Sequence, residues 1–233
     1  MTATSGQKPK ISVGDRLPED LYFGVLNEGE EEPRKITVKE VFGGKNVVLF
    51  GIPGAFTSVC SSKHLPQYYD RYDKLNQKGV NVVACTAVND PYVLREWARN
   101  HNVGGKILML ADGDASFHSA LGLTQQLPFS GIRGYRFSMY VSDGVVKIFN
   151  LEEPGALSYK VSGPDHMLQD LERLEKEDAL VKAGISISFA NACAKSDLIF
   201  KTTNFREIIR NDKTWSTGAS CLEISSDVDL FFG

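Results

Sequence analysis

The sequence predicts an α/β layered domain in which strands alternate with helices along the chain. Three observations indicate this class: short apolar runs rich in β-branched residues are separated by stretches with helical spacing, a hairpin signal follows them, and an amphipathic helix comes last. We expect the domain to span residues 8–184. Residues 185–233 show no clear periodicity and are interpreted as a C-terminal extension.

The first predicted strand and helix surround a proline–glycine loop. Lys45–Phe50 (KNVVLF) reads as a buried strand that runs into a loop containing Pro53 and Gly54. From Cys60 to Lys78, apolar and aromatic residues recur at spacings of three and four, which predicts a helix. Because proline has no backbone N–H, Pro66 is expected to kink or divide this helix.

Two further strands and helices follow in alternation. Residues 81–88 (NVVACTAV) predict a second buried strand, and residues 89–91 (Asn-Asp-Pro) are typical of a helix start. Residues 106–110 (KILML) predict a third strand, followed by a shorter helical segment within 112–122. The inward face of the helix after residue 91 is expected to carry Val93, Leu94, Trp97 and Ala98.

A hairpin and a final helix complete the predicted domain. Phe137–Val141 and Val145–Phe149 flank Ser142-Asp143-Gly144, a sequence that strongly favours a tight turn between two strands. Leucines at helical spacing then predict an amphipathic helix that opens near Asp165 and ends at Gly184.

Composition excludes several classes of protein. Of 233 residues, 42% are hydrophobic and 24% are charged, which is the balance of a globular domain. The formal net charge of -3 gives no broad basic field for nucleic acid or anionic lipid. The sequence has no run of about 18 apolar residues, so no membrane span is predicted. The polar N-terminus lacks the apolar centre of a secretory signal. We therefore expect a cytoplasmic protein.

Cysteine and histidine spacing predicts neither a metal nor another cofactor. There is no C-x-x-C pair and no Cys/His cluster at zinc spacing. His64 lies one helical turn after Cys60, but it is expected to be partly exposed on the helix, and none of the histidines is predicted to be catalytic. The four cysteines are Cys60, Cys85, Cys193 and Cys221, and the other histidines are His101, His118 and His166.

The segment Gly51–Cys60 (GIPGAFTSVC) carries the strongest chemical signal. It places Cys60 in the first turn of a helix, where free N–H groups and the helix dipole stabilise a thiolate. One turn earlier, Thr57 could bring its hydroxyl near the sulfur or cap the helix, and Pro53 could fix the loop and shield it from water. From the residues alone, Cys60 is either an activated nucleophile or a small buried apolar residue.

GIPGAFTSVC resembles the active-site segment of peroxiredoxins of the type II subgroup, also called type V. The resemblance extends from Ile11 to the helix ending near Gly184. It includes Ala84–Trp97 (ACTAVNDPYVLREW), Leu110–Gly113 (LADG) and Gly131–Gly155 (GIRGYRFSMYVSDGVVKIFNLEEPG). Several ordered matches at compatible spacings make it a specific signal.

The resemblance implies a thioredoxin-like fold, with a central mixed sheet flanked by helices, and assigns roles to individual residues. Cys60 matches the peroxidatic cysteine, with Pro53 and Thr57 as its loop partners. The arginine of the family's R-[FY]-[SA] motif falls on Arg136, and Phe129 matches an aromatic residue that walls the peroxide pocket.

The implied activity is thiol-dependent reduction of hydrogen peroxide and organic hydroperoxides, an antioxidant function that maintains redox homeostasis. The Cys60 thiolate would attack the terminal peroxide oxygen and become a sulfenic acid. Arg136, the Thr57 hydroxyl and loop N–H groups would donate hydrogen bonds as charge moves onto the leaving oxygen. The sequence departs from the family at Ser58 and Val59, usually Pro and Thr, which is expected to alter loop rigidity or rate.

Regeneration of Cys60 leaves alternatives open. Cys85 could act as an intramolecular resolving thiol, or it could be an inert core residue, as its apolar neighbours suggest. Where some relatives carry a resolving cysteine, this sequence has Ser158 and Tyr159. An external reductant, either glutathione with glutaredoxin or thioredoxin, is therefore favoured, and the resemblance also implies a homodimer.

Two other functions remain to be distinguished from peroxidase turnover. A disulfide reductase is disfavoured because C-x-x-C is missing. A redox sensor that does not turn over, or a chaperone-like scaffold, remains an alternative. The extension is either disordered or docked on the domain or a dimer face, and its cysteines, Cys193 and Cys221, are expected to be incidental.

Overall fold

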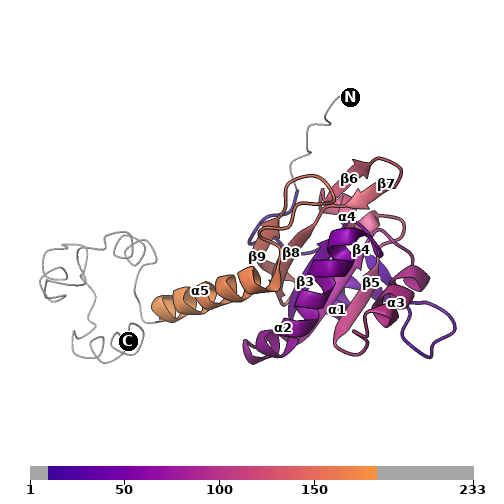
Figure 1. Ribbon diagram of the computed structural model, residues 1–233. Helices are drawn as coiled ribbons and strands as arrows, with labels where there is room; N and C mark the ends of the chain where they lie inside the picture. The colour runs from indigo at the N-terminus through magenta and orange to yellow at the C-terminus, as the bar shows by residue number, and fades with distance from the viewer. Residues whose placement is uncertain (1–9, 183–233) are drawn as a thin grey trace, which may run out of the picture. The chain divides into compact units, whose positions relative to one another are not determined.

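A mixed sheet of seven strands, in the order β2-β1-β5-β4-β3-β8-β9, forms the centre of the protein (Figure 1). The structure is a computed structural model that describes residues 10–182. A separate two-stranded sheet pairs β6 with β7. The strands are β1 (Tyr22–Val25), β2 (Arg34–Thr37), β3 (Asn46–Ile52), β4 (Val82–Ala87), β5 (Ile107–Ala111), β6 (Thr124–Leu127), β7 (Gly131–Gly134), β8 (Phe137–Ser142) and β9 (Val145–Leu151).

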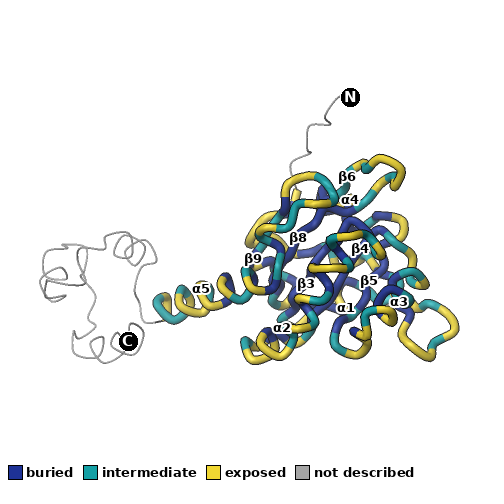
Figure 2. Tube along the Cα trace, viewed as in Figure 1, coloured by how far each residue is buried: buried dark blue, intermediate teal, exposed yellow. Residues whose placement is uncertain are grey.

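The three central strands are parallel, and the strands beside them are antiparallel. β3 pairs with β4 and β4 with β5 in parallel, whereas β8 runs antiparallel to β3 and β1 runs antiparallel to β5. Parallel strands buried on both faces are nearly continuous apolar runs, as the sequences of β3 and β4 are. Figure 2 shows these strands as the buried centre of the molecule.

Six helical segments lie within residues 10–182. The helix that was expected from Cys60 is divided, because a π-helical turn, η1, precedes α2 and Pro66 lies in the first turn of α2. No helix within residues 10–182 is long and apolar enough to cross a bilayer. The segments are α1 (Val38–Phe42), η1 (Cys60–His64), α2 (Leu65–Gln77), α3 (Pro91–Asn100), α4 (Ser116–Ala120) and α5 (Pro164–Lys182).

Successive side chains of β3 point to opposite faces of the sheet, and each face packs against different helices. Val47 and Leu49 belong to a core cluster with residues of α1 and α4. Phe50 points to the opposite face, where its ring stacks on Tyr68 of α2 at 4.1 Å between centroids. On that side the buried Trp97 of α3 donates its indole N–H to the Ser61 hydroxyl of η1 at 3.0 Å. α2 and α3 therefore position the segment that contains Cys60.

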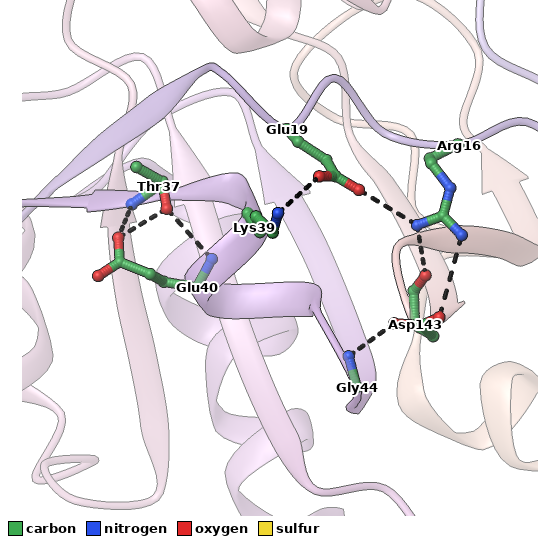
Figure 3. A network of polar contacts seen from close by, with 7 residues as sticks. All are labelled: Arg16, Glu19, Thr37, Lys39, Glu40, Gly44 and Asp143. Carbon is green, nitrogen blue, oxygen red and sulfur yellow. Dashed lines mark hydrogen bonds and ion pairs between the residues drawn. The ribbon is translucent and has the colours of Figure 1, made fainter.

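The β8–β9 turn is tied to the N-terminal part of the chain by a polar network (Figure 3). Asp143 in the turn accepts a hydrogen bond from the Gly44 N–H at 2.7 Å. Arg16 donates to the Asp143 carbonyl at 2.8 Å and pairs with Glu19 at 3.3 Å. Each exposed ion pair stabilises little, so the turn is fixed mainly by the hydrogen bonds to backbone groups.

The structure confirms the strands predicted at 45–50, 81–88 and 106–110, the hairpin, and the helices after residues 91 and 165. Sequence reasoning missed β1, β2, α1 and the β6–β7 hairpin. These elements have only four or five residues each, too few to show a period. Val93, predicted to face inward on α3, is only half-buried, whereas Leu94, Trp97 and Ala98 are buried.

The domain limits predicted at residues 8 and 184 lie outside the described residues, as do Cys193 and Cys221. The chain divides into one compact unit up to Leu171 and a second from Glu172 onward, of which only the last residues of α5 are described. The predicted domain division therefore stays a prediction.

Gly51 is the position where the sheet tolerates a side chain least. A Cβ atom there would lie 2.1 Å from Cε1 of Phe137, a buried ring on the neighbouring strand. We predict that Gly51→Ala lowers the free energy of unfolding by at least about 1–3 kcal/mol, because a packed core has no room for the added atom. Urea unfolding measures the change.

Gly104→Ala is the control, because the nearest atom to its added Cβ would be Glu28 Oε2 at 3.8 Å. Its free energy of unfolding should stay close to that of the unmodified protein. Equal unfolding midpoints for the two variants would show that the Phe137 ring moves aside freely.

Candidate active site

Cys60 lies where β3 gives way to a helix. β3 ends at Ile52, the buried residues Pro53 and Gly54 turn the chain, and η1 begins at Cys60. In this π turn the Leu65 N–H bonds to the Cys60 carbonyl. Single π turns of this kind occur often at functional sites. Cys60 is a free thiol with a fully buried side chain.

Arg136, from the short connection between β7 and β8, brings a cation to the sulfur. Its Nη1 donates to Cys60 Sγ at 3.4 Å, and its Nη2 donates to the Ala156 carbonyl at 2.7 Å. The side chain is fully buried, and Tyr159 lies beside it with the guanidinium carbon 5.9 Å from the ring centroid. The structure thus brings Cys60 and Arg136 together although they are 76 residues apart.

His64 completes this cluster, and the expectation that it is partly exposed is wrong. The imidazole is fully buried, with Nδ1 3.0 Å from Arg136 Nη1 and Nε2 3.1 Å from the Ser162 carbonyl. Because a guanidinium can only donate, Nδ1 must accept, so the proton resides on Nε2 and is donated to Ser162. Burial and the neighbouring Arg136 charge lower the pKa of His64 to about 3, which keeps the ring neutral.

Local sequence contained part of the signal for His64. It stands four residues after Cys60, so both side chains lie on one helical face. Its burial depends on the loop around Ser162, which is 98 residues away, and on a tilted ring contact with Phe50 at 4.9 Å between centroids. No local pattern reveals these distant partners.

Thr57 and Pro53 shape the loop before Cys60. The Thr57 hydroxyl donates to the Gly54 carbonyl at 2.9 Å, and the Ser61 N–H bonds to the Thr57 carbonyl at 3.0 Å. The hydroxyl proton is therefore used within the loop, whereas the oxygen lone pairs can still accept. Asn89, which sequence reasoning assigned only to a helix start, accepts the Ala55 N–H at 3.0 Å and fixes the same loop.

Phe129 is not brought to the sulfur within one chain. It lies in the turn between β6 and β7 with a φ of 63° and an exposed fraction of 110%. A fully exposed ring walls no pocket in its own subunit. Its role in a substrate pocket therefore stays a prediction.

Cys85 lies in the middle of the sheet, opposite Phe50 on β3 and Met109 on β5. Its side chain is fully buried. Burial, and next the nearby Cys60, raise the pKa of the Cys85 thiol well above its ordinary value. A buried thiol of this kind is a poor nucleophile, which favours the inert-core interpretation.

The remaining histidines do not converge on Cys60. His118 is buried and bonds through Nδ1 to Asp112 at 2.6 Å, whereas His166 contacts Asp170 at 3.6 Å. His101 packs edge-on against Trp97. Within residues 10–182, no group of three or more histidine, cysteine or acidic side chains is arranged to hold a metal ion.

Comparison with known proteins identifies the family. The model of the Redoxin family matches residues 12–163. Peroxiredoxin-2E-2 of rice, named as chloroplastic, is 40% identical over 166 residues, which are 69% of this chain and 72% of the relative. Rice peroxiredoxin-2C is 37% identical, with 69% of this chain and 98% of the relative covered. The chain belongs to the peroxiredoxin family.

A solved structure supports the same conclusion and the fold. Reduced Prx3 of Vibrio vulnificus in complex with hydrogen peroxide is 42% identical, with a TM-score of 0.64, and the match covers 69% of this chain and 99% of that one. The relatives place this peroxiredoxin in the type II subgroup. The predicted thioredoxin-like α/β fold and the predicted thiol peroxidase activity, with peroxide as substrate, are confirmed.

The neutral state of His64 makes stability depend on pH. Its pKa is about 3 in the folded peroxiredoxin, whereas an unfolded histidine has a pKa of about 6.5. The unfolded chain therefore binds the extra proton below about pH 6.5, so the stabilisation present above that pH is lost as pH falls toward 3. The slope reaches about 1.4 kcal/mol per pH unit at most.

We predict that His64→Asn removes this dependence, whereas His101→Asn retains it. Urea unfolding between pH 7 and pH 4 measures the free energy of unfolding of each variant. Parallel pH profiles for the unmodified protein and His64→Asn would contradict a buried neutral imidazole.

Proposed function

We propose that Cys60 is the peroxidatic residue of this thiol peroxidase and that Arg136 is its principal catalytic partner. The observation that carries the proposal is the buried contact of 3.4 Å between Arg136 Nη1 and Cys60 Sγ. A buried guanidinium beside the sulfur favours a negative charge there, and the thiolate is the nucleophile in reactions of cysteine. The site thus has a nucleophile and a hydrogen-bond donor directed at the same point.

The reaction balances without a metal or another cofactor. The thiolate attacks the terminal peroxide oxygen, a sulfur–oxygen bond forms as the oxygen–oxygen bond breaks, and the leaving oxygen takes a proton to become water or an alcohol. The cysteine is oxidised to a sulfenic acid and the peroxide is reduced. Arg136 would stabilise the charge that moves onto the leaving oxygen.

Thr57 contributes in a different way from the one expected from the sequence. Its hydroxyl proton is donated to Gly54, so the oxygen would accept a hydrogen bond from the peroxide O–H. Pro53, which is buried, would close the loop against water. Both residues then orient the substrate in line with the sulfur, the geometry that a displacement requires.

The burial and raised pKa of Cys85 support an external reductant. Glutathione with glutaredoxin, or thioredoxin, would reduce the sulfenic acid. Three exposed apolar residues support the predicted homodimer: Phe56 in the loop before Cys60, Phe129 in the β6–β7 turn, and Leu157 next to Ala156. The predicted cytoplasmic location stays a prediction, and similar proteins are named as chloroplastic or mitochondrial.

Substitution of the two central residues tests the proposal. We predict that Cys60→Ser abolishes peroxide consumption. Arg136→Lys should lower the rate constant about 10²–10³-fold, because lysine cannot hold the sulfur and the Ala156 carbonyl at once. The measurement is peroxide consumption with excess dithiothreitol.

The exposed Arg99→Lys is the control and should be as active as the unmodified protein. Unchanged activity of Cys60→Ser or Arg136→Lys would refute the assignment of that residue. Consumption of one equivalent of peroxide followed by a stop, despite excess reductant, would instead indicate a sensor that does not turn over.

Replacement of Cys85 tests the reductant. We predict that Cys85→Ala supports turnover with glutathione and glutaredoxin, or with thioredoxin, close to that of the unmodified protein, because Cys85 is not needed to resolve the sulfenic acid. A Cys60–Cys85 disulfide in the oxidised protein, together with lost turnover in the variant, would contradict this expectation.

A further inference from the structure

A carboxylate outside the site organises the loop that contacts it. Glu152 directly follows β9, and only 3% of the residue is exposed. Its Oε1 accepts the backbone N–H groups of Lys160, Val161 and Ser162 at 2.6, 2.8 and 2.9 Å. The hydroxyl of Ser162 also bonds to Oε1, and that of Ser158 bonds to Oε2, each at 2.9 Å.

The loop held in this way supplies two carbonyl groups to the cluster around Cys60. The Ala156 carbonyl accepts from Arg136 Nη2 at 2.7 Å. The Ser162 carbonyl accepts from His64 Nε2 at 3.1 Å and from the Tyr68 hydroxyl at 3.0 Å. The backbone N–H of Glu152 itself donates to the Arg136 carbonyl at 3.0 Å. Glu152 is therefore linked to Arg136 directly through its backbone and, by way of the loop, through its side chain.

The protonation state of Glu152 suits this role. Burial raises the pKa of the carboxyl group, but the hydrogen bonds from Ser162, Val161, Lys160 and Ser158 outweigh burial and lower it to about 2. The group is thus ionised at neutral pH. Successive backbone N–H groups that converge on one oxygen form an anion-binding nest, and here the anion belongs to the chain itself.

We propose that Glu152 is a positioning residue for peroxide reduction, because its carboxylate fixes the loop whose carbonyls orient Arg136 and His64 around Cys60. The inference rests on the proposed role of Arg136. Glu152 acts at a distance from the sulfur, since its hydrogen bonds go to the loop and to the Arg136 backbone. Without it, the loop that carries the Ala156 and Ser162 carbonyls would lose five hydrogen bonds.

Two substitutions separate the hydrogen bonds of Glu152 from its charge. In Glu152→Gln the side-chain oxygen can still accept the three N–H groups, and the amide can donate to the Ser158 hydroxyl oxygen. Glu152→Ala removes every one of these bonds. We predict that Glu152→Ala lowers the rate constant for Cys60 oxidation by hydrogen peroxide about tenfold to 10²-fold, as small displacements of catalytic groups do. Glu152→Gln should recover most of the rate.

Glu40→Ala is the matched control. Glu40 also accepts a backbone N–H, that of Thr37 at 2.7 Å, but it does so in the capping box of α1 (Figure 3). Rates are compared under conditions in which each variant is fully folded, as established by urea unfolding. Nitrogen NMR of His64 provides a second measurement: the protonated Nε2 and unprotonated Nδ1 signals expected for the unmodified protein should change in Glu152→Ala and persist in Glu40→Ala.

The outcomes distinguish this inference from the proposed function. If Glu152→Ala reacts at the rate of the unmodified protein while Arg136→Lys reacts slowly, the positioning role is overturned and the proposed function stands. Rates equal to that of the unmodified protein in both variants would also refute the proposed catalytic role of Arg136. Equal losses in Glu152→Ala and Glu40→Ala, or in Glu152→Ala and Glu152→Gln, would also overturn positioning by hydrogen bonds.

Discussion

The contact between the Arg136 guanidinium and the Cys60 sulfur is the constraint on which the site depends. A buried cation is costly unless charges or dipoles compensate it. The hydrogen bonds of this guanidinium go to a neutral imidazole, a carbonyl and the sulfur itself. The sulfur is therefore the one of these three partners that can take up a compensating negative charge. The proposed role of Cys60 as the nucleophile rests on this contact.

The fold meets this constraint with elements that are far apart in sequence. The end of β3 and the π turn place Cys60, the connection between β7 and β8 places Arg136, and the loop after β9 supplies carbonyl groups. Pairing of β3 with both β4 and β8 makes the strand ends rigid, because each is bonded on two sides. Rigid placement matters because catalysis by oriented hydrogen bonds is lost when the groups are free to move.

Sequence reasoning predicted the parts of this arrangement that local patterns encode. The strand–loop–helix setting of Cys60 follows from apolar runs and a Pro-Gly turn, and family motifs pointed to Arg136. The burial of His64 and the loop around Glu152 could not be predicted, since both depend on partners brought together only by the complete fold. The Thr57 hydroxyl was expected to donate toward the substrate, but it donates to Gly54, whose carbonyl direction no sequence pattern reveals.

The hydrogen bond from Trp97 to Ser61 has a consequence for following the chemistry. The indole N–H bonds to Ser61, the residue directly after Cys60, so the environment of the ring depends on the position of the turn that contains the sulfur. If conversion of the thiol to a bulkier sulfenic acid displaces that turn, the polarity around the indole changes with it. The emission of Trp97 would then report the oxidation state of the enzyme during turnover, without an added dye.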